Sequence, residues 1–142
     1  MVKNDKVQIP LELISYVLEN KLVTAFKVYM YLKCSTSGKI HQNDAIISQM
    51  GLFLDIKDRR TLRKHLEVLM ALNWVGYNQE SGYYFIRSIS SLRKQLGIKK
   101  RNAATFHFKD LNNFHAFLAG SLISGAINSQ KYYWKVVKNR LS

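Results

Sequence analysis

The run DRRTLRKHLEVLMALNW, residues 58–74, indicates a capped helix, a core-forming surface and a cluster of positive charge. Asp58 suits the N-cap, because its carboxylate accepts hydrogen bonds from the free N–H groups of a first helical turn and favours the positive end of the helix dipole. At about 100° per residue, the apolar side chains share one side: Leu62, Leu66, Leu69 and Met70, flanked by Leu72, with Val68 at the edge. The other side carries Arg60, Arg63, Lys64 and Glu67. One face therefore needs a core, and the other favours an anionic partner.

Length and composition favour one soluble domain, or a small domain with an extension. The 142 residues are enough to bury a core without help from a disulfide or a metal. Cys34 is the single cysteine and no Cys/His set has zinc-ligand spacing, so no metal or other cofactor is expected. Met1 begins no signal-peptide pattern, and the longest apolar stretch, residues 114–127, is shorter than the ~20 residues of a membrane span. We expect a cytoplasmic protein with no membrane partner, associated with the nucleoid if bacterial.

The positive charge is large and unevenly distributed. The formal net charge is +13, from 22 Lys and Arg against 9 Asp and Glu. Residues 1–87 contribute +4, whereas residues 88–142 contribute +9 and hold a single acid, Asp110. Such an excess is the electrostatic footprint of a nucleic-acid binder, because neutralising phosphates releases condensed counterions. The alternative is a basic surface that only keeps the protein soluble.

Three helices and a short strand are predicted before residue 58. Residues 1–7 are interpreted as loose chain, followed by a helix with Pro10 in its first turn. The run 22–34 is apolar almost all round, which predicts a buried helix at the centre of the core. Residues 39–41 fit a short strand. Asn43 is then the expected N-cap of a helix over residues 44–50, with Gly51 as its stop.

After Trp74 the pattern becomes extended. Two β-rich runs, residues 75–77 and 83–87, enclose turn-forming residues that end in Gly82, and together they predict a hairpin. Over residues 22–88, the short helix ending in Gly51, the run 61–75 and the hairpin closed by Gly82 resemble the winged helix-turn-helix DNA-binding domains. The resemblance implies a fold that is mainly α with a small β hairpin, whose third helix enters the major groove of DNA. The link over residues 52–57 is longer and more apolar than the tight turn usual in that superfamily.

Residues 89–142 are predicted to form a basic helical extension to a winged-helix domain of residues 1–88. Residues 88–97 fit a short helix, residues 105–109 a strand or extended chain, and Asp110 the cap of a helix over residues 110–127. That helix is more apolar than a lone terminal helix needs. It either packs back on the first domain or forms a homodimer interface, which Ala119 and Gly120 would allow through close helix approach. Residues 130–141 fit a further helix with a row of lysines.

The candidate DNA contacts follow from the resemblance and the charge. Arg60, Arg63 and Lys64 are the candidate recognition residues, since Arg suits guanine O6 and N7 and Lys suits single contacts. The alternative is a solvated face on which Arg63 pairs with Glu67. The candidate phosphate contacts are Lys57, Arg59, Arg87, Lys99, Lys100, Arg101, Lys131, Lys135 and Lys138. The hairpin loop contains Glu80 and no cation, so we expect little contact from it.

Three hairpin tyrosines, Tyr77, Tyr83 and Tyr84, could stack on the bases of a single strand, although packing across the hairpin is the expected role. No enzyme is expected, because the four histidines are dispersed and no phosphate-binding or nucleophile motif is present. The sequence predicts a double-stranded DNA-binding protein, either a transcriptional regulator or a replication-initiation or accessory factor of a mobile element. The alternative is an RNA-binding or protein-interaction module in which the winged domain is a scaffold and the basic extension binds.

Overall fold

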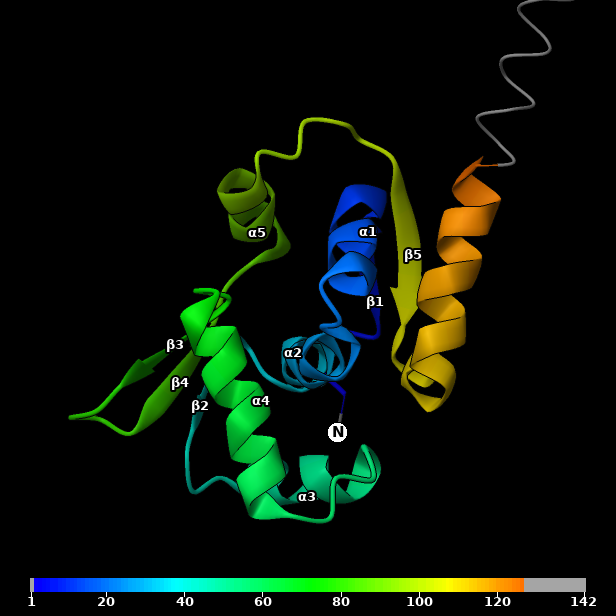
Figure 1. Cartoon of the computed structure of the whole chain (residues 1–142). Helices are drawn as coiled ribbons and strands as arrows, with labels where there is room; N and C mark the ends of the chain where they lie inside the picture. The colour runs from blue at the N-terminus through cyan, green and yellow to red at the C-terminus, as the bar shows by residue number, and fades with distance from the viewer. Residues whose placement is uncertain (1, 127–142) are drawn as a thin grey trace, which may run out of the picture.

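Helices dominate the part of the chain that the computed structural model describes, residues 2–126, and two small antiparallel sheets accompany them (Figure 1). The elements are β1 Lys6–Pro10, α1 Leu11–Glu19, α2 Val23–Ser35, β2 Lys39–His41, α3 Ala45–Phe53, α4 Arg59–Ala71, β3 Val75–Asn78, β4 Tyr83–Ile86, α5 Ile89–Leu96, β5 Ala103–His107 and the 3-10 helix η1 Phe108–Asn113. Residues 114–126 continue as an α-helix. The expected mainly helical class with a small β part is confirmed. The helix predicted over residues 130–141 lies outside the described residues.

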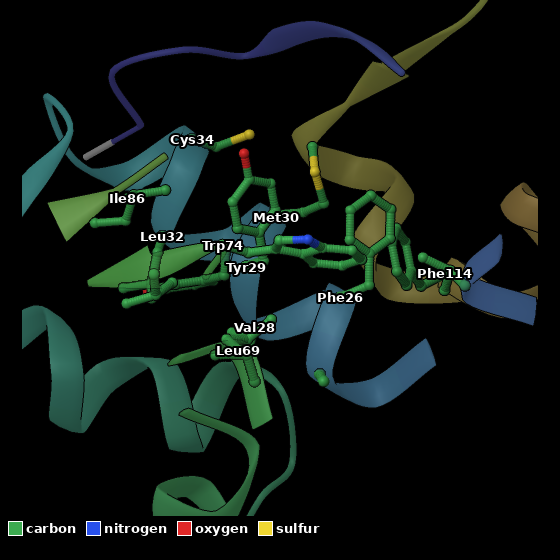
Figure 2. Close-up of a cluster of buried hydrophobic side chains, with 14 of the residues drawn as sticks. Phe26, Val28, Tyr29, Met30, Leu32, Cys34, Leu69, Trp74, Ile86 and Phe114 are labelled. Atoms are coloured by element: carbon green, nitrogen blue, oxygen red, sulfur yellow. The ribbon is translucent and has the colours of Figure 1, made fainter. Parts of the chain in front are cut away.

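Helix α2 forms the centre of the core, as its nearly uniform apolar sequence predicts. Phe26, Tyr29 and Leu32 are all fully buried, and α1, α3 and α4 pack around the helix (Figure 1). Trp74 is only 1% exposed and packs against two aromatic rings of α2. Its ring centroid lies 6.0 Å from that of Phe26 and 6.3 Å from that of Tyr29 (Figure 2). Phe114 reaches the same cluster, 5.8 Å from Phe26. Segments from both halves of the chain thus share one core.

The three-stranded sheet has the strand order β2-β4-β3 and two unlike faces. Strand side chains alternate between faces. One face carries the buried side chains Ile40, Val75 and Ile86. The opposite face, which we call the outer sheet face, carries exposed and half-buried residues only: Lys39, His41, Gly76, Asn78, Tyr83 and Phe85.

A second sheet corrects the prediction for the N-terminus. Residues 1–7 were expected to be loose, but Lys6 and Val7 belong to β1, which pairs with β5 along its whole length. Gln8 Nε2 donates to Thr105 Oγ1 at 2.9 Å across this pair. Pro10 ends β1 at the N-cap of α1 and does not lie in the first helical turn. Its missing N–H costs nothing at that position.

Three helix-boundary predictions are also wrong. Asp44, not Asn43, caps α3, with Oδ1 accepting from Ile46 N at 2.9 Å. Gly51 is a buried residue inside α3, where an added Cβ would lie 3.1 Å from the carbonyl oxygen of Ile56. The link to α4 therefore folds back over a position that only glycine fills without a shift. Asp110 is the third residue of η1 and accepts from His107 N at 2.8 Å, so it completes a cap without occupying the N-cap position.

The helix of residues 114–126 packs back on the rest of the chain. Phe114 and Leu118 are buried, and Phe117 lies against Phe106 of β5 with ring centroids 5.5 Å apart. An added Cβ at Gly125 would lie 2.6 Å from Leu11 Cδ1, so this helix lies close to the Leu11 side chain of α1. By contrast, Gly120 is exposed and an added Cβ there would have nothing within 4 Å.

Candidate nucleic-acid interface

Helix α4 is built as the sequence predicts. Asp58 is its N-cap, and Oδ1 accepts from Arg60 N at 2.9 Å. Leu62, Leu66 and Leu69 are buried, largely against α2. This packing fixes which side of the helix faces water. The side chains predicted for the opposite side, Arg60, Arg63, Lys64 and Glu67, are all exposed.

The cations on this face are not neutralised by neighbouring acids in the described residues. In residues 2–126, the one contact within 4.0 Å between a nitrogen of a basic side chain and a carboxylate oxygen joins His107 Nδ1 to Asp5 Oδ2. The surface pair between Arg63 and Glu67, expected if the face were only solvated, is therefore not formed. The positive charges of α4 remain available to an anionic partner.

A groove of about 530 Å³ lies beside the start of α4. Its walls come from α3, the link to α4, the first two turns of α4 and Tyr84 of the hairpin. Lys57, Arg59 and Arg63 line it together with polar groups of Gln42, Asn43 and Ser48. Burial, reinforced by nearby Tyr77, raises the pKa of Tyr84 despite the opposing charge of Arg63. The Tyr84 hydroxyl therefore keeps its proton at neutral pH and remains a hydrogen-bond donor.

Two of the hairpin tyrosines, Tyr77 and Tyr84, pack against each other across the hairpin, as expected. Tyr77 and Tyr84 have ring centroids 4.8 Å apart, and Tyr77 Oη donates to Gln42 Oε1 at 2.8 Å. Tyr83 meets His41 edge-on at 5.2 Å. At the turn, Asn78 Oδ1 accepts from the N–H groups of residues 80 and 81 at 3.0 and 3.1 Å, and these hydrogen bonds stabilise the loop that bears Glu80.

The other candidate phosphate contacts do not join the α4 face. Arg87 Nη2 is 3.5 Å from Asn73 Oδ1, a weak hydrogen bond at the base of the hairpin. Lys99, Lys100 and Arg101 are exposed in the loop between α5 and β5, at the end of the molecule opposite the link between α3 and α4 (Figure 1). Arg93 Nη1 donates to the carbonyl oxygen of Lys100 at 3.0 Å and steadies this loop. The candidates Lys131, Lys135 and Lys138 lie outside the described residues.

His65 and Cys34, two side chains of types that often act in catalysis, pack against the interior of the protein. His65 is half-buried, and burial lowers the pKa of its imidazole, so it adds no positive charge to α4 at neutral pH. Cys34 is buried, and burial raises the pKa of its thiol to about 11. A thiol with so high a pKa is a weak nucleophile.

Removal of the Asp58 cap should destabilise the protein. Asp58→Ala deletes the acceptor for Arg60 N, and we expect a loss of about 0.5–2 kcal/mol in the free energy of unfolding. Asp58→Asn is the matched control, because its side-chain oxygen still caps the helix and should keep most of that stability. Urea denaturation of both variants measures this. Equal stability of Asp58→Ala and wild type would contradict the role of the cap.

In residues 2–126, no helix is long and apolar enough to cross a membrane. No group of three or more His, Cys, Asp or Glu side chains in that same range could hold a metal ion. Comparison with known proteins finds no matching family model, curated protein or solved structure.

Proposed function

We propose that this chain is a double-stranded DNA-binding protein of winged-helix type that reads DNA with α4. The observation that carries the proposal is the exposed face of α4, where Arg60, Arg63 and Lys64 have no acid within 4.0 Å among the described residues. Its role would be that of a transcriptional regulator or of a replication-initiation or accessory factor of a mobile element.

The order of the elements supports this proposal. The chain runs α2, β2, α3, α4, β3, β4, with the sheet order β2-β4-β3, so that a hairpin follows the basic helix directly. In the winged helix-turn-helix superfamily, which the sequence resembles, the helix before the hairpin is the one that enters the major groove. The positive charge of α4 occupies that position.

The dimensions of α4 also suit a major groove. Its 13 residues span about 20 Å, and a helix about 10–12 Å across fits a groove about 12 Å wide. Arg60, Arg63 and Lys64 would face the base edges or nearby phosphates. Lys57 and Arg59, in the groove beside α3, would contact the backbone. The turn of the hairpin bears Glu80, which disfavours close approach to phosphate.

A binding titration separates this function from the alternative, an RNA-binding or protein-interaction module. We compare the affinity of the full chain for a duplex DNA pool with its affinity for an RNA hairpin of equal length. Fluorescence anisotropy measures both affinities at several salt concentrations. The proposal expects tighter binding to DNA and a steep loss of affinity with salt, because each neutralised phosphate contributes about −0.9 to the slope of log K against log salt. Tighter binding to the RNA hairpin would favour the alternative.

A homodimer through the helix of residues 114–126, which the sequence predicted over residues 110–127, is part of the proposal, and Gly120 tests it. The position is open, so Gly120→Leu costs no clash inside the chain but would obstruct a second helix. We expect the variant to lower the molar mass measured by light scattering from that of a dimer toward that of a monomer. Ser124→Ala is a mild control on the same helix. A wild-type protein that is monomeric at high concentration would contradict the dimer.

A further inference from the structure

The outer sheet face is left open to solvent, although the opposite face of the same sheet lies in the core. On the central strand β4, Phe85 is 37% exposed and Tyr83 is half-buried. Lys39 lies across from Phe85 in the register, and its Nζ is 5.5 Å from the Tyr83 ring centroid. We propose that this face binds single-stranded nucleic acid, with bases stacked on Phe85 and Tyr83 and phosphates near Lys39 and Arg87.

The spacing of the two rings favours a single strand over a duplex. Tyr83 and Phe85 are two residues apart on one strand, so their Cβ atoms share a face and are roughly 6.6 Å apart along it. Stacked nucleotides in a duplex are about 3.4 Å apart. Bases on both rings must therefore be splayed out of a continuous stack. Single strands permit this, and exposed aromatic side chains on a sheet suit such bases.

A glycine provides room beside Phe85. Gly76 is its register partner on β3, and the absence of a side chain there leaves room for the Arg87 guanidinium. A hollow of about 580 Å³ extends from there and is lined by Gly76, Phe85, Arg87 and residues 77–80. The Arg87 guanidinium lies in the hollow, because Nη2 is only 3.1 Å from the place of an added Cβ at Gly76. A planar base on Phe85 would thus have a cation beside it.

Charge complementarity makes a polyanion the expected occupant. Lys39 and Arg87 have no carboxylate within 4.0 Å among the described residues. Glu80 of the hairpin turn is the one acid among the residues that line the hollow. Stacking that tolerates any base, combined with cations that follow the backbone, is the chemistry of single-strand binding.

This inference goes beyond the proposed duplex binding and uses the opposite side of the sheet. Tyr77 and Tyr84 point to the α4 side, where Arg63 and Glu67 both affect the pKa of Tyr84. Phe85 and Tyr83 point away from it. The two surfaces can therefore be tested, and can fail, separately.

Fluorescence anisotropy of the full-length protein with a labelled 12-nucleotide oligonucleotide tests the proposal. The three probes are single-stranded DNA, RNA of the same sequence and an abasic DNA backbone of the same length. We expect Phe85→Ala to weaken binding of the first or second probe roughly 5- to 150-fold, the value of one stacked base. Phe53→Ala, which removes another exposed aromatic ring on α3, is the matched control and should leave that affinity unchanged. Binding of only one of the DNA and RNA probes also supports the proposal, and it shows whether the site prefers deoxyribose or ribose.

Two further variants give readouts that a purely structural role would not change. Phe85→Trp should retain single-strand binding, and its added fluorescence should be quenched when the oligonucleotide stacks on it. Arg60→Ala/Arg63→Ala/Lys64→Ala should keep single-strand binding, whereas Phe85→Ala should keep duplex binding. Equal affinity for the abasic backbone, no quenching in Phe85→Trp, or unchanged affinity in Phe85→Ala would each overturn the proposal. Absence of duplex binding would overturn only the proposed function.

Discussion

Replacing Arg60, Arg63 and Lys64 together by alanine is expected to lower the affinity for duplex DNA at least about 100-fold at physiological salt. The three side chains are exposed and have no acid within 4.0 Å among the described residues. The variant therefore loses interactions with DNA and does not break internal ion pairs. Each lost base contact is worth about 1–3 kcal/mol. Anisotropy titrations at several salt concentrations measure both the affinity and its salt slope, which should become shallower.

The matched control for this prediction is Lys99→Ala/Lys100→Ala/Arg101→Ala. It also removes three positive charges, but from the loop between α5 and β5 at the other end of the molecule (Figure 1). If general electrostatics alone governed binding, the two triple variants would lose equal affinity. The proposed role of α4 instead requires the first loss to be much larger. An α4 variant that binds duplex DNA like wild type would contradict the assignment.

Trp74→Ala is expected to lower the free energy of unfolding by about 3–5 kcal/mol. Trp74 is 1% exposed and packs against Phe26 and Tyr29 of α2 as well as Tyr16 of α1. It lies between α4 and β3, and its backbone N–H donates to the Leu69 carbonyl oxygen at 2.9 Å, which ties it to the last turn of α4. Small domains have only about 5–15 kcal/mol of stability in total. Urea denaturation followed by far-ultraviolet circular dichroism measures the loss.

Phe85→Ala is the control for this second prediction, because it removes an exposed aromatic ring from the same hairpin region. It should cost less than about 1 kcal/mol, the scale of one cross-strand pair. A Trp74→Ala variant that is no less stable than Phe85→Ala would contradict the central position of Trp74 in the core.

Local patterns in the sequence were sufficient to predict α4 and its surroundings. The cap at Asp58, the buried face with Leu62 and Leu66, and the hairpin after Trp74 all depend on residues close together in the chain. Helix period and turn chemistry act over such short ranges. The sequence therefore predicted correctly that Arg60, Arg63 and Lys64 are exposed, because a helix that buries one face presents the other to water.

Long-range pairing could not be predicted in the same way. Strand β1 has its partner β5 nearly a hundred residues away, and although residues 105–109 fit a strand, nothing in either segment indicates its partner. Gly51 has the sequence signature of a helix stop, yet it is selected by the close approach of the Ile56 carbonyl oxygen. The exposure of Phe85 depends on which face of the sheet the core covers. Each of these features is decided by tertiary contacts.

Selection of duplex DNA from a random-sequence pool with the full-length protein, followed by sequencing, tests the central claim most directly. We predict that wild-type protein enriches a defined sequence at physiological salt and that Arg60→Ala/Arg63→Ala/Lys64→Ala does not. No enrichment over the starting pool by wild type, or the same enriched sequence with the variant, would contradict the proposal that α4 reads DNA.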